Sequence, residues 1–254
     1  MTPSSLSLPA VRARGRPDGA AFTLIELMVV IGIIGLLVAV GGVALNGRAT
    51  EGVALANAQI ALRGLVGSAR AQAALHQTNA RLLVYAQLPP TGDAAKYLRY
   101  LQVVREETDP RGATIWVAAG DPVTLPAPIC VVPPTIPSNH LELPAGQTWN
   151  TNAATGAVSV FSPTILTGFT IRGQSSSTAP ILFGGTGGGR AYYFEFDATG
   201  AITTNATNNP TKIALATAVI SGAAVPRFNN ASGVRGLTVR KSGAISLVND
   251  ATGF

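Results

Sequence analysis

The sequence predicts an α+β fold in which a long N-terminal helix packs on a C-terminal antiparallel β domain. Residues 22–45 form an apolar run, and residues 46–79 place small and aliphatic residues at helical spacing. Residues 80–254 consist of short runs rich in β-branched and aromatic residues, bounded by glycine, proline and asparagine. An amphipathic helix and a sheet must each bury one face, so the two are expected to share a core.

The composition argues against several classes of function. Charged residues make up 12% of the 254 residues, against about 25% in a typical soluble domain. The single cysteine, Cys130, excludes an internal disulfide and makes a thiolate metal cluster implausible. Two histidines and one cysteine offer no catalytic triad. We therefore expect neither an enzyme nor a bound cofactor or metal.

The N-terminal 45 residues predict a membrane anchor. Residues 1–21 form a leader that carries three arginines, and Phe22–Leu45 is a run of 24 residues with one charge, Glu26. About 20 apolar residues span a bilayer as a helix, and positive charge before a span favours a cytoplasmic N-terminus. The later residues would then be extracytoplasmic. Three interpretations compete: a secretory signal peptide, whose apolar core is usually shorter, a plain signal anchor, and a prepilin.

Glu26 separates the last two interpretations. A carboxylate inside hydrocarbon is costly and usually has a partner, for which a plain anchor has no use. Alternatively, Glu26 lies near the cytoplasmic edge of the membrane and extends its carboxylate to water. The residues around it resemble the N-terminal motif of type IV pilins and type II secretion pseudopilins: Phe22, Thr23, Leu24, Ile25, Glu26 and Leu27.

This resemblance implies a processing and assembly site. Prepilin peptidase would cut between Ala21 and Phe22, and the new amino group of Phe22 would be methylated. Glu26 would pair with the Phe22 amine of a neighbouring subunit, so the partners would be other pilins in a filament that starts from the inner membrane. The family usually has glycine before the cut, where this sequence has Ala21.

Residues 46–79 predict the amphipathic half of the helix, with Asn79 as a plausible stop. One face is formed by apolar residues three and four positions apart: Leu55, Ala58, Leu62, Leu65, Ala69 and Ala73. Polar residues are expected largely on other faces: Glu51, Gln59, Arg63, Arg70 and Gln77.

The rest of the chain predicts an extracytoplasmic β domain, residues 80–254, with a proline-rich insertion at about 88–146. The expected strands are Arg81–Gln87, Tyr97–Arg105, Thr114–Ala118, Val158–Phe161, Phe169–Arg172, Ala191–Phe196, Lys212–Ala216, Gly236–Arg240 and Ala244–Val248. Three similar segments place Gly156, Gly200 and Gly243 in expected hairpin turns. The order of elements over 190–248 resembles the C-terminal β region of GspH/FimT-type pseudopilins.

The sequence thus predicts a minor pseudopilin, a structural subunit of a type II secretion pseudopilus or a type IV pilus. A pilus-associated subunit that binds DNA or a surface and a plain signal-anchored extracytoplasmic protein are the alternatives. Basic residues gather loosely near the C-terminus, at Arg227, Arg235, Arg240 and Lys241. Because phosphate binding needs several cations on one face, this distribution does not favour nucleic acid as a partner. The acidic run at Glu106, Glu107 and Asp109 is expected to be solvated.

Overall fold

The computed structural model describes the backbone of residues 24–87, 93–136, 141, 143, 145–146, 149–150, 152, 156–162, 165–171, 181–182, 189–204, 211–220, 226–228 and 230–254. Within the helix, side chains are described at 28–31, 33 and from 51 onward, and those of 167–171 and 181–182 are outside the description. The chain divides into two compact units, Met1–Gly47 and Arg48–Phe254, and each is described by itself.

The backbone of α1 is helical over Leu24–His76. In the first unit the described side chains are all large, apolar and exposed: Met28, Val29, Val30, Ile31 and Ile33. Within the described residues, no helix combines the length and the apolar character that a membrane crossing needs. The leader 1–21 and most side chains of the segment 22–45 lie outside the described residues, so the membrane half of the helix stays a prediction.

In the second unit α1 packs on antiparallel sheets, as the sequence predicts. All six apolar residues of the expected face are buried: Leu55, Ala58, Leu62, Leu65, Ala69 and Ala73. They belong to one hydrophobic core that also includes strand residues of both sheets. On other faces of this part of α1, Val53, Ile60 and Leu75 are exposed.

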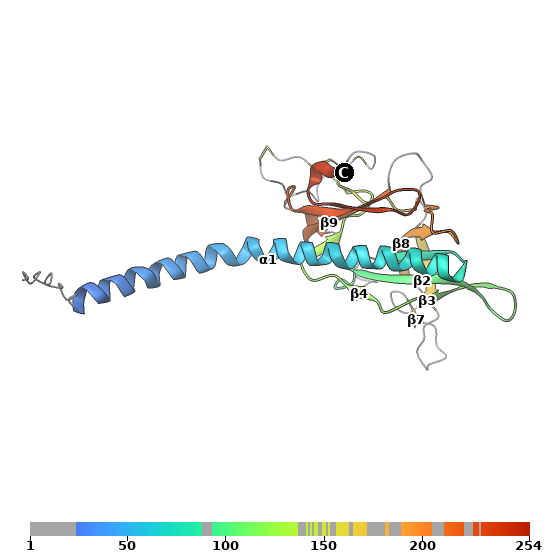
Figure 1. Cartoon of the computed structure of the whole chain (residues 1–254), viewed down its shortest axis with the longest axis horizontal. Helices are drawn as coiled ribbons and strands as arrows, with labels where there is room; N and C mark the ends of the chain where they lie inside the picture. The colour runs from blue at the N-terminus through green and yellow to red at the C-terminus, as the bar shows by residue number, and fades with distance from the viewer. Residues whose placement is uncertain are drawn as a thin grey trace, which may run out of the picture. The chain divides into compact units, whose positions relative to one another are not determined.

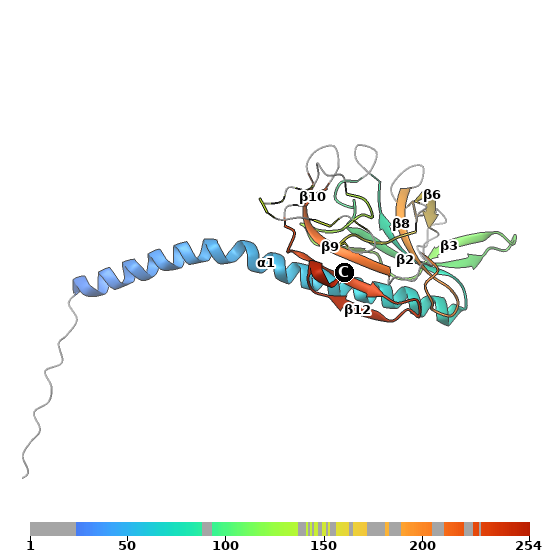
Figure 2. The same ribbon diagram turned by 90° about the horizontal axis from the view of Figure 1, so that it is seen from above.

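Two sheets make up the β domain, and both lie against this part of α1 (Figure 1; Figure 2 shows the same arrangement from above). The first sheet has the order β3-β2-β1-β8-β6-β7, with β4 paired to β2, and the second has the order β10-β9-β11-β12, with β5 paired to β9. The first contains β1 (Ala80–Tyr85), β2 (Tyr100–Thr108), β3 (Thr114–Ala118), β4 (Val123–Thr124), β6 (Leu166–Ile171), β7 (Ile181–Leu182) and β8 (Gly189–Phe196). The second contains β5 (Ile129–Val131), β9 (Thr211–Ile220), β10 (Pro226–Phe228), β11 (Val234–Val239) and β12 (Ile245–Val248), and is followed by the 3-10 helix η2 (Ala251–Gly253).

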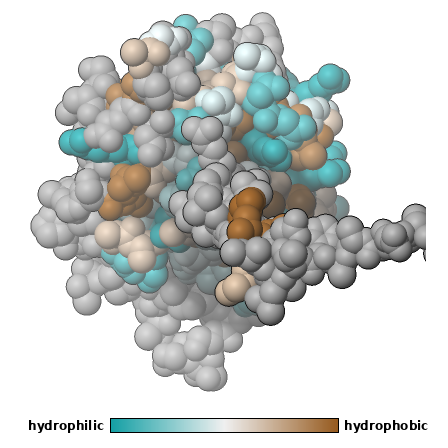
Figure 3. All heavy atoms as spheres, turned by 90° about the vertical axis from the view of Figure 1, so that its left-hand side faces the viewer, coloured by the Kyte–Doolittle hydropathy of each residue, from teal (hydrophilic) through white to brown (hydrophobic). Residues whose placement is uncertain are grey.

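Strand β1 is central to the first sheet because both of its edges are paired. Leu82 lies opposite Val103 of β2 and Phe194 of β8, and all three side chains are buried. Paired residues of neighbouring strands point to the same face of a sheet, so these three form one layer of the core. On the face drawn in Figure 3, hydrophilic residues separate the hydrophobic ones into small groups.

One expected strand is absent, and the short strands β4, β5, β7 and β10 were not expected. Residues 158–161 do not form a strand; instead the amide of Val160 donates to the carbonyl of Lys212 at 2.8 Å, beside β9. Strand β5 was not expected, because it lies among prolines, which are poorly tolerated in central strands. It nevertheless pairs with β9, and its residues Ile129, Cys130 and Val131 are fully buried.

Two of the three expected turn glycines adopt the conformation that a tight hairpin needs. Gly200 and Gly243 have φ values of 77° and 78°, a region open mainly to glycine. The two turns also touch, since the amide of Ile202 donates to the carbonyl of Lys241 at 3.0 Å. Gly156 has no positive φ; a Cβ there would overlap the backbone of Asn150.

Candidate functional site

The expected processing motif coincides with the start of α1. The helix begins at Leu24, the third residue of the motif, so Glu26 lies in its first turn. The first amide groups of a helix have no partner within the helix, and the helix dipole favours negative charge there. Ala21, Phe22 and Thr23 lie outside the described residues, as do the side chains of Leu24, Ile25, Glu26 and Leu27. The pairing of Glu26 with an amine therefore stays a prediction.

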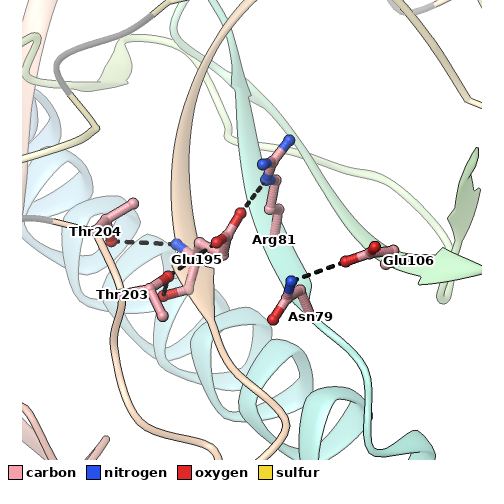
Figure 4. Close-up of polar contacts among 6 residues, drawn as sticks. All are labelled: Asn79, Arg81, Glu106, Glu195, Thr203 and Thr204. Carbon is pink, nitrogen blue, oxygen red and sulfur yellow. Dashed lines mark hydrogen bonds and ion pairs between the residues drawn. The ribbon is translucent and has the colours of Figure 1, made fainter. Parts of the chain in front are cut away.

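A second cluster of polar residues lies in the β domain and centres on Arg81 of β1 (Figure 4). Arg81 is in register with Glu195 of β8, and its Nε donates to a carboxylate oxygen of Glu195. The other oxygen of Glu195 accepts from the hydroxyl of Thr203 at 2.9 Å. The amide of Glu195 donates to the hydroxyl of Thr204 at 3.2 Å. The carboxylate is thus held on both of its oxygens.

Two aromatic rings fix the guanidinium of Arg81. Its Cζ lies 4.0 Å from the ring centroid of Trp116 and 4.4 Å from that of Tyr193. Such stacking is favourable within about 6 Å and strengthens as water is excluded. The side chains of Arg81 and Glu195 are only 17% and 15% exposed. Breaking a pair at such burial leaves a charge without its partner, which is costly.

The acidic run beside this cluster is paired, although the sequence analysis expected it to be solvated. The side-chain amide Nδ2 of Asn79 donates to a carboxylate oxygen of Glu106 at 2.8 Å (Figure 4). Arg105 forms an ion pair with Glu107 and also contacts the imidazole of His76 at 3.1 Å. The carboxylate of Asp109 accepts from the backbone amides of Arg111 and Ala113 in the turn between β2 and β3, at 2.9 and 2.8 Å. These carboxylates therefore stabilise the sheet and its connection to α1.

The described histidine, cysteine and acidic side chains do not gather at a metal site. Within the described part of the chain, no three histidine, cysteine or acidic side chains gather to hold a metal ion. Cys130 is fully buried, and burial raises the pKa of its thiol to about 12. A thiol with such a pKa carries almost no thiolate at neutral pH, so Cys130 fits neither a nucleophile nor a metal ligand.

The four basic residues near the C-terminus do not form one cluster. Arg227 and Arg235 lie on β10 and β11, whereas Arg240 and Lys241 lie in the turn after β11. Five residues of extended chain separate Arg235 from Arg240, about 17 Å at about 3.3 Å per residue. The structure therefore spreads these charges along the sheet.

Gln59 is the polar residue that the sequence analysis placed wrongly. It is only 4% exposed, and its Nε2 donates to the carbonyls of Gly236 and Val248 at 2.8 and 2.7 Å. The spacing contained a signal for this position, since Gln59 is four residues after Leu55 and three before Leu62, both buried. It therefore lies on the buried stripe of α1, where its amide connects the helix to β11 and β12.

Comparison with known proteins bears on the N-terminal segment. Residues 18–42 match the family described as Prokaryotic N-terminal methylation motif. This range includes the junction of Ala21 and Phe22 and the whole of the expected motif. Neither a curated protein nor a solved structure matches the chain.

Proposed function

We propose that this chain is a minor pseudopilin of the GspH/FimT kind, a structural subunit of a type II secretion pseudopilus or a type IV pilus. The observation that carries the proposal is the methylation motif over residues 18–42, placed at the start of α1. This motif indicates a type IV pilin-like protein that prepilin peptidase processes. In this proposal the chain is anchored in the inner membrane, with its β domain outside the cytoplasm, before it enters the filament.

The β domain supports a structural role for the chain. Two of its buried or part-buried polar contacts connect separate elements: Gln59 joins α1 to the second sheet, and Arg81 joins β1 to β8. The order of elements at the C-terminal end supports the GspH/FimT subtype: β8 runs into the Gly200 turn, β9 pairs with β11, and the Gly243 turn closes the β11–β12 hairpin. We accordingly propose an assembly subunit and not an enzyme.

Glu26 has a definite role in this proposal. Cleavage before Phe22 would create a cation next to the membrane, and Glu26 would supply the opposite charge from a neighbouring subunit. Removing one member of a buried ion pair is strongly destabilising, because the other charge is left without a partner. The pair would therefore fix the register between subunits more than it adds net stability.

The processing test is intact-mass analysis of the membrane-extracted chain after co-expression with a prepilin peptidase. The expected product lacks residues 1–21 and carries one added methyl group. An Ala21→Gly variant tests whether alanine slows the cut. A full-length product from both chains would contradict the proposal and support a plain signal anchor.

The assembly test compares Glu26→Gln with Glu51→Gln, a matched change further along α1. Both variants are expected to be processed, because neither alters the cleavage point. Only Glu26→Gln should lose co-purification with sheared filaments from cells that express the other pilins. Equal recovery of the two variants in the filament fraction would contradict the role of Glu26.

Salt-sensitive DNA binding by the purified chain would instead favour a binding subunit.

A further inference from the structure

Lys212 is a buried cation that the proposed function leaves unexplained. It lies on β9 and is only 2% exposed, and its Nζ has no hydrogen-bond partner among the residues that the structure describes. The residues that follow it on the strand, Ile213 to Ala216, are apolar and fully buried. A lysine in such surroundings is rare unless a partner is present.

Among the described residues, no acidic side chain forms an ion pair with Lys212. Burial of an ammonium group without hydrogen bonds is costly, and this desolvation lowers the pKa of Lys212. The contact recorded for Nζ among the described residues is the ring of Phe254, with the centroid 5.8 Å away. This distance is near the limit of about 6 Å for a cation–π interaction. The ring therefore compensates only part of the cost, and the site favours an anion.

The ring of Phe254 occupies a slot with a floor of small residues. Lys212 pairs with Thr238, and Ala214 pairs with Gly236, so all four lie on the same face of the second sheet. A Cβ on Gly236 would lie 2.1 Å from the carbonyl oxygen of Ile213 and 2.8 Å from the tip of the Phe254 ring. Glycine at this position thus allows both the close approach of the β9 backbone and the seat of a planar ring.

The segment that carries Phe254 is held by local hydrogen bonds and by the partial packing of Ala251 and Phe254 on the core. Asp250 caps η2 by accepting from the amides of Thr252 and Gly253 at 2.9 and 3.0 Å. No residue of η2 is buried, and Phe254 itself is only partly buried. Segments with few buried contacts open at low free-energy cost. The ring can therefore leave its slot without unfolding the sheet.

We propose that Lys212 and the slot over Gly236 form a binding site for a carboxylate attached to an aromatic group, with the Phe254 ring as a plug. The ring of the ligand replaces that of Phe254, and its carboxylate neutralises Lys212. Both a free aryl carboxylate and a protein segment with an acidic residue beside an aromatic one present this chemistry. The site is independent of the proposed filament role.

The plug is tested by a brief pulse of acetic anhydride on the full chain in detergent, with acetylation measured by peptide mass spectrometry. The chain has three lysines, and the exposed Lys96 and Lys241 serve as internal controls. Lys212 should react at least about tenfold more slowly than Lys96, because it must first be exposed by local opening. Phe254→Ala should raise the Lys212 rate about tenfold and leave Lys96 unchanged. An unchanged Lys212 rate in this variant would overturn the plug.

The ligand is tested on Phe254→Ala with 3-phenylpropionate and with 3-phenylpropanol, which has the same ring but no charge. The acid should protect Lys212 at about tenfold lower concentration than the alcohol, because charged hydrogen bonds are the stronger ones. Lys212→Met should remove this difference when binding is followed by ligand NMR. Equal protection by acid and alcohol would overturn the carboxylate site.

N-acetyl-Phe-Asp-amide distinguishes the two sources of the ligand. If it binds more tightly than 3-phenylpropionate, the ligand is a protein segment; if it binds more weakly, the ligand is a free acid.

Discussion

The attachment of α1 to the second sheet predicts a large effect for Gln59→Ala. Gln59 is the polar residue of the buried stripe, and it donates to two carbonyls that belong to different strands, at 2.8 and 2.7 Å. Gly236 and Val248, which supply those carbonyls, are paired in the β11–β12 ladder. Truncation to alanine removes both donors and leaves a void between the helix and the hairpin.

The expected loss in the free energy of unfolding is about 1–6 kcal/mol for the two hydrogen bonds together. Each bond contributes roughly 0.5–1.5 kcal/mol net, whereas a buried carbonyl left unpaired costs about 1–3 kcal/mol. Water that enters the void can satisfy part of this deficit, as buried waters commonly bond unpaired polar groups. The lower figure corresponds to a void that fills with water, and the upper figure to one that stays dry.

The measurement is urea denaturation of the full chain in detergent, followed by tryptophan fluorescence. Both tryptophans, Trp116 and Trp149, lie in the β domain, so the signal reports its unfolding. Arg63→Ala on an exposed face of the same helix is the control and should change stability by less than about 0.5 kcal/mol. If Gln59→Ala costs no more than this control, the attachment of α1 to β11 and β12 does not depend on Gln59.

Three further predictions use the same denaturation assay. Gly243→Ala should cost about 1–3 kcal/mol, because its φ is 78° and a Cβ would lie 2.4 Å from the carbonyl oxygen of Gly200 and 2.6 Å from Nε of Arg70. Gly112→Ala has a similar φ but open space around it and should cost less. Equal losses would show that these contacts are unimportant. Arg81→Ala should lower the free energy of unfolding by about 2–3 kcal/mol, because it breaks the half-buried pair with Glu195. Lys96→Ala, at an exposed pair, should cost less than about 1 kcal/mol. A loss below about 1 kcal/mol for Arg81→Ala would refute the role of the rings. The hydroxyl of Thr199 lowers the pKa of Asp197, so this carboxylate contributes stability above an unfolded pKa of about 3.9 that is lost as pH falls through its lower folded value. Asp197→Ala should therefore flatten the acid limb of the pH profile, and an unchanged limb would contradict this.

The sequence predicts those parts of the fold that local patterns encode. Helical spacing identifies the buried stripe of α1, because side chains three and four residues apart share a face. The turn at Gly243 is visible for a similar reason, since the conformation it needs is restricted mainly to glycine. The bounds of β3, Thr114–Ala118, also agree with the expected strand.

Long-range pairing is the part that no local pattern encodes. Arg81 and Glu195 are 114 residues apart in sequence, and either one could equally stand at an exposed strand position. The polarity of Gln59 predicts an exposed position, whereas its spacing predicts a buried one. The buried position is the one observed, because the side-chain amide donates to two backbone carbonyls. The processing motif is the opposite case: its residues are contiguous, so the sequence reveals it fully, whereas the partner of Glu26 belongs to another chain in the proposed assembly.

The contacts of α1 bear directly on the proposed role in a filament. Three side chains spaced along the second unit's helix contact residues that are distant in sequence: Gln59 reaches β11 and β12, Arg70 the Gly243 carbonyl at 3.3 Å in the turn between them, and His76 reaches Arg105 of β2. Of the three, only Gln59 is buried. Apolar packing alone is non-directional, whereas hydrogen bonds fix the register of the helix on the sheets. In the proposed filament role, a pull on the helix would reach the β domain through this packing and these contacts, and Gln59 would hold the register from within an otherwise apolar stripe.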